Sequence, residues 1–309
     1  MDEIILHHYP ASPVSEKVRV ALGIKNLPWR SVQVSRLPPR EELFVLTGGF
    51  RRVPVMQIGA DIYCDSQCIL RELDRRFPKP SFFPAGIAGL PFGLSRWIDG
   101  ALFDEAVRLA FAPMVDTLPA DLVNDRARLY LGPEGDFRRE LQDLPHQEAQ
   151  LRAQIGWLDQ ALADGRKFLL DDAPGLADCL AYYIIWFLRG RWDRGPEFLR
   201  EFDKLTAWEK RVKALGHGRP SAMTAEEALE IGINAQPKTP EQSDARDSLG
   251  LAPGMDVEIV TDADSGETPV RGVIRAINRE TISIHRIDLD AGMVCLHFPR
   301  VGYRVSASA

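Results

Sequence analysis

Hydrophobic and polar positions in the first 84 residues alternate between strand and helix patterns. Apolar runs or strict alternation, which are typical of strands, occur at 4–6, 29–34, 53–58 and 61–63. Apolar positions three and four residues apart, which are typical of helices, recur at 12–25, 39–46 and 65–77. Gly59 and Ala60 separate the last two strands as a hairpin turn does. The order of elements is therefore predicted to be βαβαββα.

A long helical region follows a stretch at 78–91 that is rich in proline and glycine, as a linker between domains is. From 90 to 233 the pattern contains no strand of useful length. Its longest helical segments are 140–163, 175–188 and 196–215. We expect an all-helical domain over 90–233.

Strand patterns return after a polar, proline-bearing stretch at 234–248 that is typical of a solvated linker. They occur at 256–261, 270–277, 281–287 and 293–298, separated by turn-like segments at 262–266 and 290–292. Four or five short strands so close together predict a small β-barrel-like module over 249–309. The fold class is therefore α+β, multidomain, with predicted domains at 1–84, 90–233 and 249–309.

Composition and charge exclude several classes of protein. The chain has 309 residues, 45% of them hydrophobic and 27% charged, which fits two or three globular domains with ample cores. A net charge of -6 argues against nucleic acid as a partner, because nucleic acid demands a basic face. No apolar run reaches the ~20 residues of a membrane span, and the acidic start is unlike a secretory signal. We expect a cytoplasmic protein without membrane contact.

The four cysteines are scattered and fit a reducing compartment. They form no CxxC pair and show no metal-ligand spacing, so no metal is predicted.

Ser12 is a candidate for chemistry because it precedes Pro13 at a predicted helix start, directly after a strand. The helix amides and macrodipole favour an anion there. One hydrogen bond to a charged group contributes ~1.5–3 kcal/mol, which lowers a thiol pKa by about one to two units. A thiol bound at Ser12 would then be mostly ionised near neutral pH. A simple helix cap is the alternative explanation, and Tyr9 and Ser15 are further hydroxyls nearby.

Four motifs along the chain carry a family resemblance. They are a strand–helix segment at 9–22 that contains Ser12 and KVRVAL, RVPV at 52–55, DSQCIL at 65–70 and PGLAD at 174–178. In this order and spacing they resemble the soluble glutathione S-transferases, in particular the theta-, zeta-, beta- and omega-like classes that use Ser or Cys. The resemblance implies a thioredoxin-like first domain that binds glutathione as co-substrate.

The resemblance also implies residue roles. Ser12 would be catalytic and would hold the glutathione thiolate. Val53, before a cis Pro54, would pair its backbone with the cysteinyl part of glutathione. Asp65 and Ser66 would bind the γ-glutamyl end, the Asp65 carboxylate taking the ammonium group. Arg52 or Arg51 would pair with the glycyl carboxylate.

Departures from the family pattern refine this expectation. Serine instead of cysteine at position 12 argues against deglutathionylation chemistry. Gly175 stands where the family has a Ser or Thr cap, and glycine at an N-cap costs only a few tenths of a kcal/mol, so we expect the helix to form. Asp178 is still expected to accept backbone N–H bonds at that helix start.

The predicted function is conjugation of glutathione to a small hydrophobic electrophile, as in detoxification. A glutathione-dependent isomerase, dehalogenase or lyase would share the first half-reaction. The family also implies a homodimer. The alternative is a non-catalytic binding or scaffold protein whose C-terminal module contacts a partner, because fold does not fix function.

Overall fold

The computed structural model describes residues 3–263 and 265–308, which form two compact units. The first unit contains the described residues up to Ser15, those of Pro28–Leu73 and those from Arg219 onward. The second contains Glu16–Leu27 and Asp74–Gly218. The units are defined by packing rather than by chain order, so the boundaries of three consecutive domains stay a prediction.

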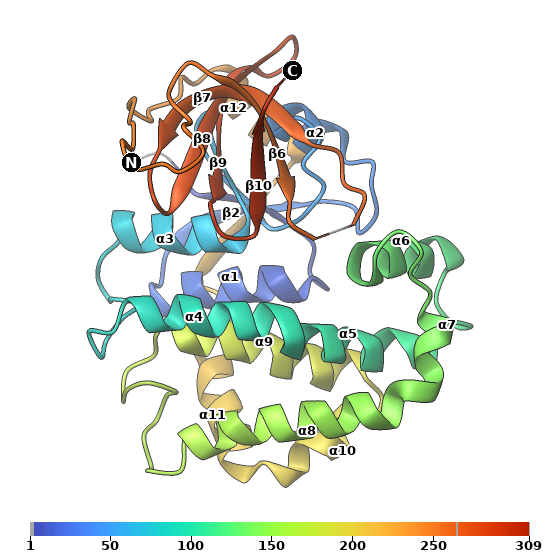
Figure 1. Cartoon of the computed structure of the whole chain (residues 1–309). Coiled ribbons are helices and arrows are strands. Elements are labelled where there is room, and N and C mark those ends of the chain that lie inside the picture. Colours follow the sequence, from blue (N-terminus) through green and yellow to red (C-terminus); the bar gives the residue numbers. More distant parts are fainter. Residues whose placement is uncertain (1–2, 264, 309) are drawn as a thin grey trace. The chain divides into compact units, whose positions relative to one another are not determined.

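The first unit is built on one sheet, in which ten strands are found among the described residues (Figure 1). In chain order they are β1 (Ile5–His8), β2 (Pro28–Gln33), β3 (Val55–Ile58), β4 (Asp61–Cys64), β5 (Arg219–Met223), β6 (Asp256–Thr261), β7 (Val270–Ile277), β8 (Thr281–Asp288), β9 (Gly292–Pro299) and β10 (Tyr303–Ala307). Their order in space is β10-β6-β7-β8-β9-β4-β3-β1-β2-β5. The helices between them along the chain include α1 (Pro13–Ile24), α2 (Glu41–Thr47), α3 (Ser66–Arg76) and α12 (Ala225–Ile233).

The first seven elements, β1 to α3, confirm the predicted βαβαββα order. β1 pairs in parallel with β2 and antiparallel with β3, and β3 pairs antiparallel with β4. All four residues of each of β1, β3 and β4 are buried, which explains why their apolar residues are adjacent rather than alternating.

Strands β6 to β10, called the C-terminal strands below, confirm the predicted β segments and add a fifth strand. They continue the first sheet, because β9 pairs in parallel with β4. They also share one hydrophobic core with the first part of the chain: Ile62 and Leu46 pack in the same cluster as Ile284 and Phe298. In place of the predicted separate barrel-like module, the C-terminal strands extend the thioredoxin-like sheet.

The expectation of no strand within 90–233 is wrong for β5. This strand pairs in parallel with β2, with Trp29 opposite Pro220. Four of its five side chains are exposed, so it carries no hydrophobic alternation that a sequence pattern could detect. Backbone pairing to the edge of β2 makes it a strand.

The second unit is helical, as predicted. Its further elements are α4 (Gly89–Trp97), the π-helical turn η1 (Ile98–Leu102), α5 (Phe103–Phe111), η2 (Ala112–Met114), α6 (Ala120–Leu131), α7 (Phe137–Glu140), η3 (Leu141–Asp143), α8 (Leu144–Ala161), α9 (Leu176–Arg191), α10 (Gly195–Phe198), η4 (Leu199–Glu201) and α11 (Asp203–Ala214). Helix α9 is central, because α4, α5, α10 and α11 all pack against it. No helix among the described residues combines the length and apolar character that crossing a membrane requires.

The start of α9 confirms the expected role of Asp178. Its carboxylate accepts hydrogen bonds from the backbone N–H groups of Gly175 (2.8 Å) and Leu169 (2.9 Å), and from Trp208 Nε1 (2.7 Å). These bonds tie the backbone at Gly175 and the preceding loop to the first turn of α9, although Gly175 itself offers no side-chain cap.

Helix α1 buries its charged side as well as its apolar side. Glu16, Lys17 and Arg19 are 2%, 1% and 5% exposed. Lys17 Nζ donates to both carboxylate oxygens of Asp99, at 2.7 and 2.8 Å. The Tyr183 hydroxyl donates to the same carboxylate at 2.7 Å. Ion pairs therefore compensate the cost of burying these charges.

Candidate functional site

The predicted site residues follow or precede three neighbouring strands at the same end of the sheet. His7 in β1 lies opposite Val55 in β3, and Val55 lies opposite Cys64 in β4. The loop with Ser12 follows β1, Pro54 precedes β3 and Asp65 follows β4. The strand register therefore brings these segments together at one end of the strands.

Ser12 caps helix α1. Its Oγ accepts hydrogen bonds from the backbone N–H of Ser15 at 3.2 Å and from the Ser15 hydroxyl at 2.9 Å. Ser12 is 2% exposed and Ser15 is 0% exposed. An oxygen that accepts a hydrogen bond becomes a better donor through its own O–H, because linked hydroxyls polarise one another. Ser12 is therefore the N-cap of α1, and its hydroxyl is linked to that of Ser15.

The peptide bond between Val53 and Pro54 is cis, as the resemblance implies. Pro54 is buried, whereas Val53 is partly exposed. Val53 also packs against the hydrophobic core that the C-terminal strands share.

Asp65 is held in an unusual backbone conformation, with φ at 76°. Left-handed backbone is uncommon outside glycine, and residues held there cluster at functional sites. Its Oδ1 accepts the backbone N–H of Gln67 at 2.8 Å, which caps α3. Its Oδ2 accepts the hydroxyl of Tyr303 at 3.1 Å. Ser66, the first residue of α3, is 4% exposed.

Arg52 forms an ion pair with Glu267. Arg52 Nε lies 2.9 Å from both carboxylate oxygens, and Nη2 lies 2.5 Å from Oε2. Ser265 and Thr261 also donate to Glu267, at 2.6 and 2.9 Å. Burial raises the pKa of Glu267, but the hydrogen bonds, that from Arg52 first, outweigh it and leave the pKa below its usual range. The Glu267 carboxylate is therefore ionised and hydrogen-bonded to Arg52, Ser265 and Thr261.

Sequence reasoning missed Glu267 and Tyr303 at this site. They lie more than 200 positions along the chain from the residues they bind, and no local pattern marks them. The pairing of β9 with β4 brings Glu267 and Tyr303 close to this site. The register between strands that are distant in the chain cannot be predicted from a single sequence.

The two neighbouring histidines, His7 and His8, each form a hydrogen bond with a side chain. His7 Nε2 lies 2.9 Å from Gln57 Oε1, and burial lowers the pKa of His7 to about 4. His8 Nε2 lies 2.8 Å from Ser31 Oγ. His7 is therefore neutral at physiological pH.

Three potential metal ligands, Asp61, Cys295 and His297, have ligand atoms within 4.8 Å of one another. Their polar atoms are engaged: His297 Nε2 lies 3.2 Å from Asp61 Oδ1, and its Nδ1 lies 2.8 Å from Ser283 Oγ. Burial raises the pKa of Cys295 to about 12, so its thiol is protonated. This cluster acts as a hydrogen-bonded joint between β4 and the C-terminal strands.

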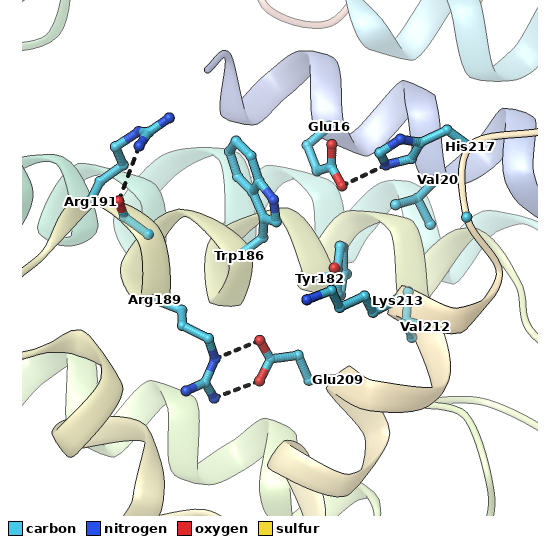
Figure 2. A pocket seen from close by; sticks show the side chains of 12 residues that line it. Glu16, Val20, Tyr182, Trp186, Arg189, Arg191, Glu209, Val212, Lys213 and His217 are labelled. Carbon is cyan, nitrogen blue, oxygen red and sulfur yellow. Dashed lines mark hydrogen bonds and ion pairs between the residues drawn. The ribbon is translucent and has the colours of Figure 1, made fainter. Parts of the chain in front are cut away.

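A cavity of about 420 Å³ lies in the second unit, and Figure 2 shows the side chains that line it. It is lined by Glu16, Val20, Tyr182, Trp186, Arg189, Gly190, Arg191, Glu209, Val212, Lys213, Gly216 and His217. Several of its charges are paired within the wall: Arg189 with Glu209 at 2.6 Å, and His217 with Glu16 at 2.9 Å. None of the residues predicted as a site from the sequence lines it.

The fold and the site define a class: a thioredoxin-like sheet with a serine-capped first helix, joined in one chain to a helical unit. Family models agree with this. Residues 6–81 match the N-terminal domain of glutathione S-transferase, and residues 125–211 match its C-terminal domain. The chain belongs to the glutathione S-transferase family.

Solved structures extend the comparison. A GST-like protein from Pseudomonas syringae is 33% identical, covers 100% of both chains and superposes with a TM-score of 0.81. A glutathione S-transferase from Rhodospirillum rubrum F11 is 21% identical over 68% of this chain and 88% of its own, with a TM-score of 0.52. FzlA from C. crescentus is 22% identical over 76% and 94%, with a TM-score of 0.50. The last two show the fold alone. A search of curated proteins finds no match.

Proposed function

We propose that this protein is a serine-type glutathione transferase, in which Ser12 stabilises the thiolate of bound glutathione for attack on a small hydrophobic electrophile. The observation that carries the proposal is the pair of hydroxyls at the start of α1, where Ser15 donates to Ser12. This pair lies at the same sheet end as Pro54 and Asp65.

The proposed chemistry needs little from the protein beyond charge stabilisation and position. The glutathione thiol releases its proton to solvent, and the Ser12 O–H and the helix amides stabilise the sulfur anion. The sulfur electron pair then forms the new bond to the electrophilic carbon, while a leaving group departs with its bonding pair or, in an addition, the π pair of the attacked double bond moves away from that carbon and later takes up a proton from water. Holding both reactants together supplies much of the remaining acceleration. Isomerase, dehalogenase and lyase reactions would begin with the same ionisation.

The remaining roles are assigned by family resemblance. The backbone of Val53, beside Pro54, would pair with the cysteinyl part of glutathione. The carboxylate of Asp65 and the start of α3 at Ser66 would hold the two charges of the γ-glutamyl end. Arg52 already binds Glu267 through Nε and Nη2, so the glycyl carboxylate would share this guanidinium with Glu267.

Calorimetric titration with glutathione, together with ultraviolet titration of the bound thiol, tests the proposal. We expect the wild-type protein to lower the thiol pKa by about one to two units, and Ser12→Ala to abolish this shift. Ser35→Ala is a matched control, because the Ser35 hydroxyl also accepts a backbone N–H, from Leu37 at 3.3 Å, but lies in an exposed turn. Failure to bind glutathione at millimolar concentration would overturn the proposal.

A second candidate function is a glutathione-binding scaffold whose C-terminal strands contact a partner. It is favoured by the end of β8 and the turn that follows, where Ile287 and Leu289 are 76% and 103% exposed. Binding of glutathione with an unshifted thiol pKa would favour this candidate over the enzyme. A homodimer and a cytoplasmic location remain predictions from the family and the composition.

A further inference from the structure

The C-terminal strands contact several of the residues assigned to glutathione. Glu267 binds Arg52, the shared core packs against Val53, and Tyr303 binds Asp65. These contacts all lie within the first unit.

Tyr303 is fixed in place by its ring. It is 8% exposed and packs against Phe298 and Phe50, with ring centroids 5.5 and 6.4 Å away. Burial, together with the negative charge of Asp65, raises the pKa of Tyr303 well above its usual value. The hydroxyl therefore keeps its proton and donates a hydrogen bond to Asp65.

Asp65 in turn is held at both oxygens. The Gln67 N–H binds Oδ1 and the Tyr303 hydroxyl binds Oδ2, while the backbone is in the left-handed region. A carboxylate oxygen has two lone pairs and can accept more than one hydrogen bond. A carboxylate fixed in this way loses little conformational entropy when it binds an ammonium group.

We propose that Tyr303 is a positioning residue for the glutathione site, orienting the Asp65 carboxylate toward the γ-glutamyl ammonium. This inference rests on the proposed function, since it takes Asp65 as the ligand's ammonium partner. The inference gives the C-terminal strands a role, because they supply a residue that positions one of the side chains assigned to glutathione.

The ion pair between Arg52 and Glu267 serves this role as an anchor. The Glu267 side chain is 6% exposed, and it receives hydrogen bonds from Arg52, Ser265 and Thr261. It fixes the segment that follows β6 against the chain just before Pro54. Tyr303 and Glu267 thus hold the C-terminal strands at two points that flank β3 and β4 in the chain.

The test compares two ligands on the full chain by calorimetry. The first ligand is glutathione, and the second is glutaryl-cysteinyl-glycine, which lacks only the α-amino group. We expect Tyr303→Phe to weaken glutathione binding about threefold to tenfold, because a hydrogen bond to a charged group is lost, and to leave binding of the second ligand unchanged. Tyr63→Phe is the matched control: its hydroxyl also donates to a buried carboxylate, that of Glu72 at 3.0 Å, but not to Asp65.

A double-mutant cycle guards against a merely structural effect. In an Asp65→Asn background, Tyr303→Phe should cause no further loss of glutathione affinity. Equal weakening of both ligands, unchanged binding in Tyr303→Phe, or additive losses in the cycle would each overturn the inference. Wild-type protein that binds the two ligands equally would also overturn it, while leaving the role of Ser12 intact. Wild-type protein that binds no glutathione would defeat the proposed function and this inference together.

Discussion

Replacing Asp99 with Asn tests whether the buried ammonium group of Lys17 depends on its carboxylate partner. The Lys17 side chain is 1% exposed and that of Asp99 is 29% exposed, with 2.7 Å between Nζ and Oδ1. Breaking one partner of a buried ion pair costs about 3–5 kcal/mol, because the other charge is left uncompensated. Water reaches Asp99, so we expect the lower end, about 3 kcal/mol, for Asp99→Asn.

The two hydroxyl groups that donate to Asp99 add little to this loss of stability. Tyr183 and Ser95 donate to the carboxylate at 2.7 and 2.6 Å, and both hydroxyls can rotate to accept from an amide instead. The loss should therefore come from Lys17. In a Lys17→Met background, Asp99→Asn should cost less than about 1 kcal/mol, because no buried ammonium remains.

Urea denaturation followed by circular dichroism measures these free energies of unfolding. Glu201→Gln is the control: it breaks an ion pair with Arg152 in the same unit, but both side chains are largely exposed, at 46% and 62%. We expect no measurable change in its unfolding midpoint. If Asp99→Asn costs the same with and without Lys17, the reasoning is refuted.

Three further predictions follow from other residues. Ser15→Ala should raise the pKa of the bound glutathione thiol, though less than Ser12→Ala does, and ultraviolet titration checks this. His7 has a folded pKa of about 4, below its unfolded value of 6.5, so the unfolded chain takes up the proton first as pH falls. Stability should drop below pH 6.5 by up to about 3 kcal/mol, and denaturation of His7→Gln across that range should show a flatter profile. Gly218→Ala should cost more than about 2 kcal/mol, because φ is +71° and its Cβ would lie 2.6 Å from a backbone oxygen, whereas Gly89→Ala, with open space, should be neutral in the same assay.

Local signals allowed much of the fold to be predicted. The order of the first seven elements follows from short apolar runs and helical spacing, and Ser12 with Pro13 marks the start of α1. Strands β6 to β9 were predictable because alternation and turns are also local. The N-cap position of Ser12 and the peptide bond at Pro54 agree with what the family resemblance implied.

Contacts between distant segments were not predictable in this way. From the sequence, Lys17 would be expected to be a solvated charge on α1. The structure places Asp99, 82 positions later, beside it. Tyr303 is an ordinary strand residue until β10 and α3 come together at Asp65. Strand β5 has no hydrophobic pattern at all, since its role is to pair with β2.

The order in which the sheet is completed has a consequence for synthesis on the ribosome. Among the described residues, β4 and β2 are the outermost of the first four strands, and their outer edges are paired by β9 and β5, which are translated after the helices α4 to α11. Until then the nascent chain presents two open strand edges, which are templates for aggregation. Transcripts truncated before Arg219 should therefore yield insoluble protein.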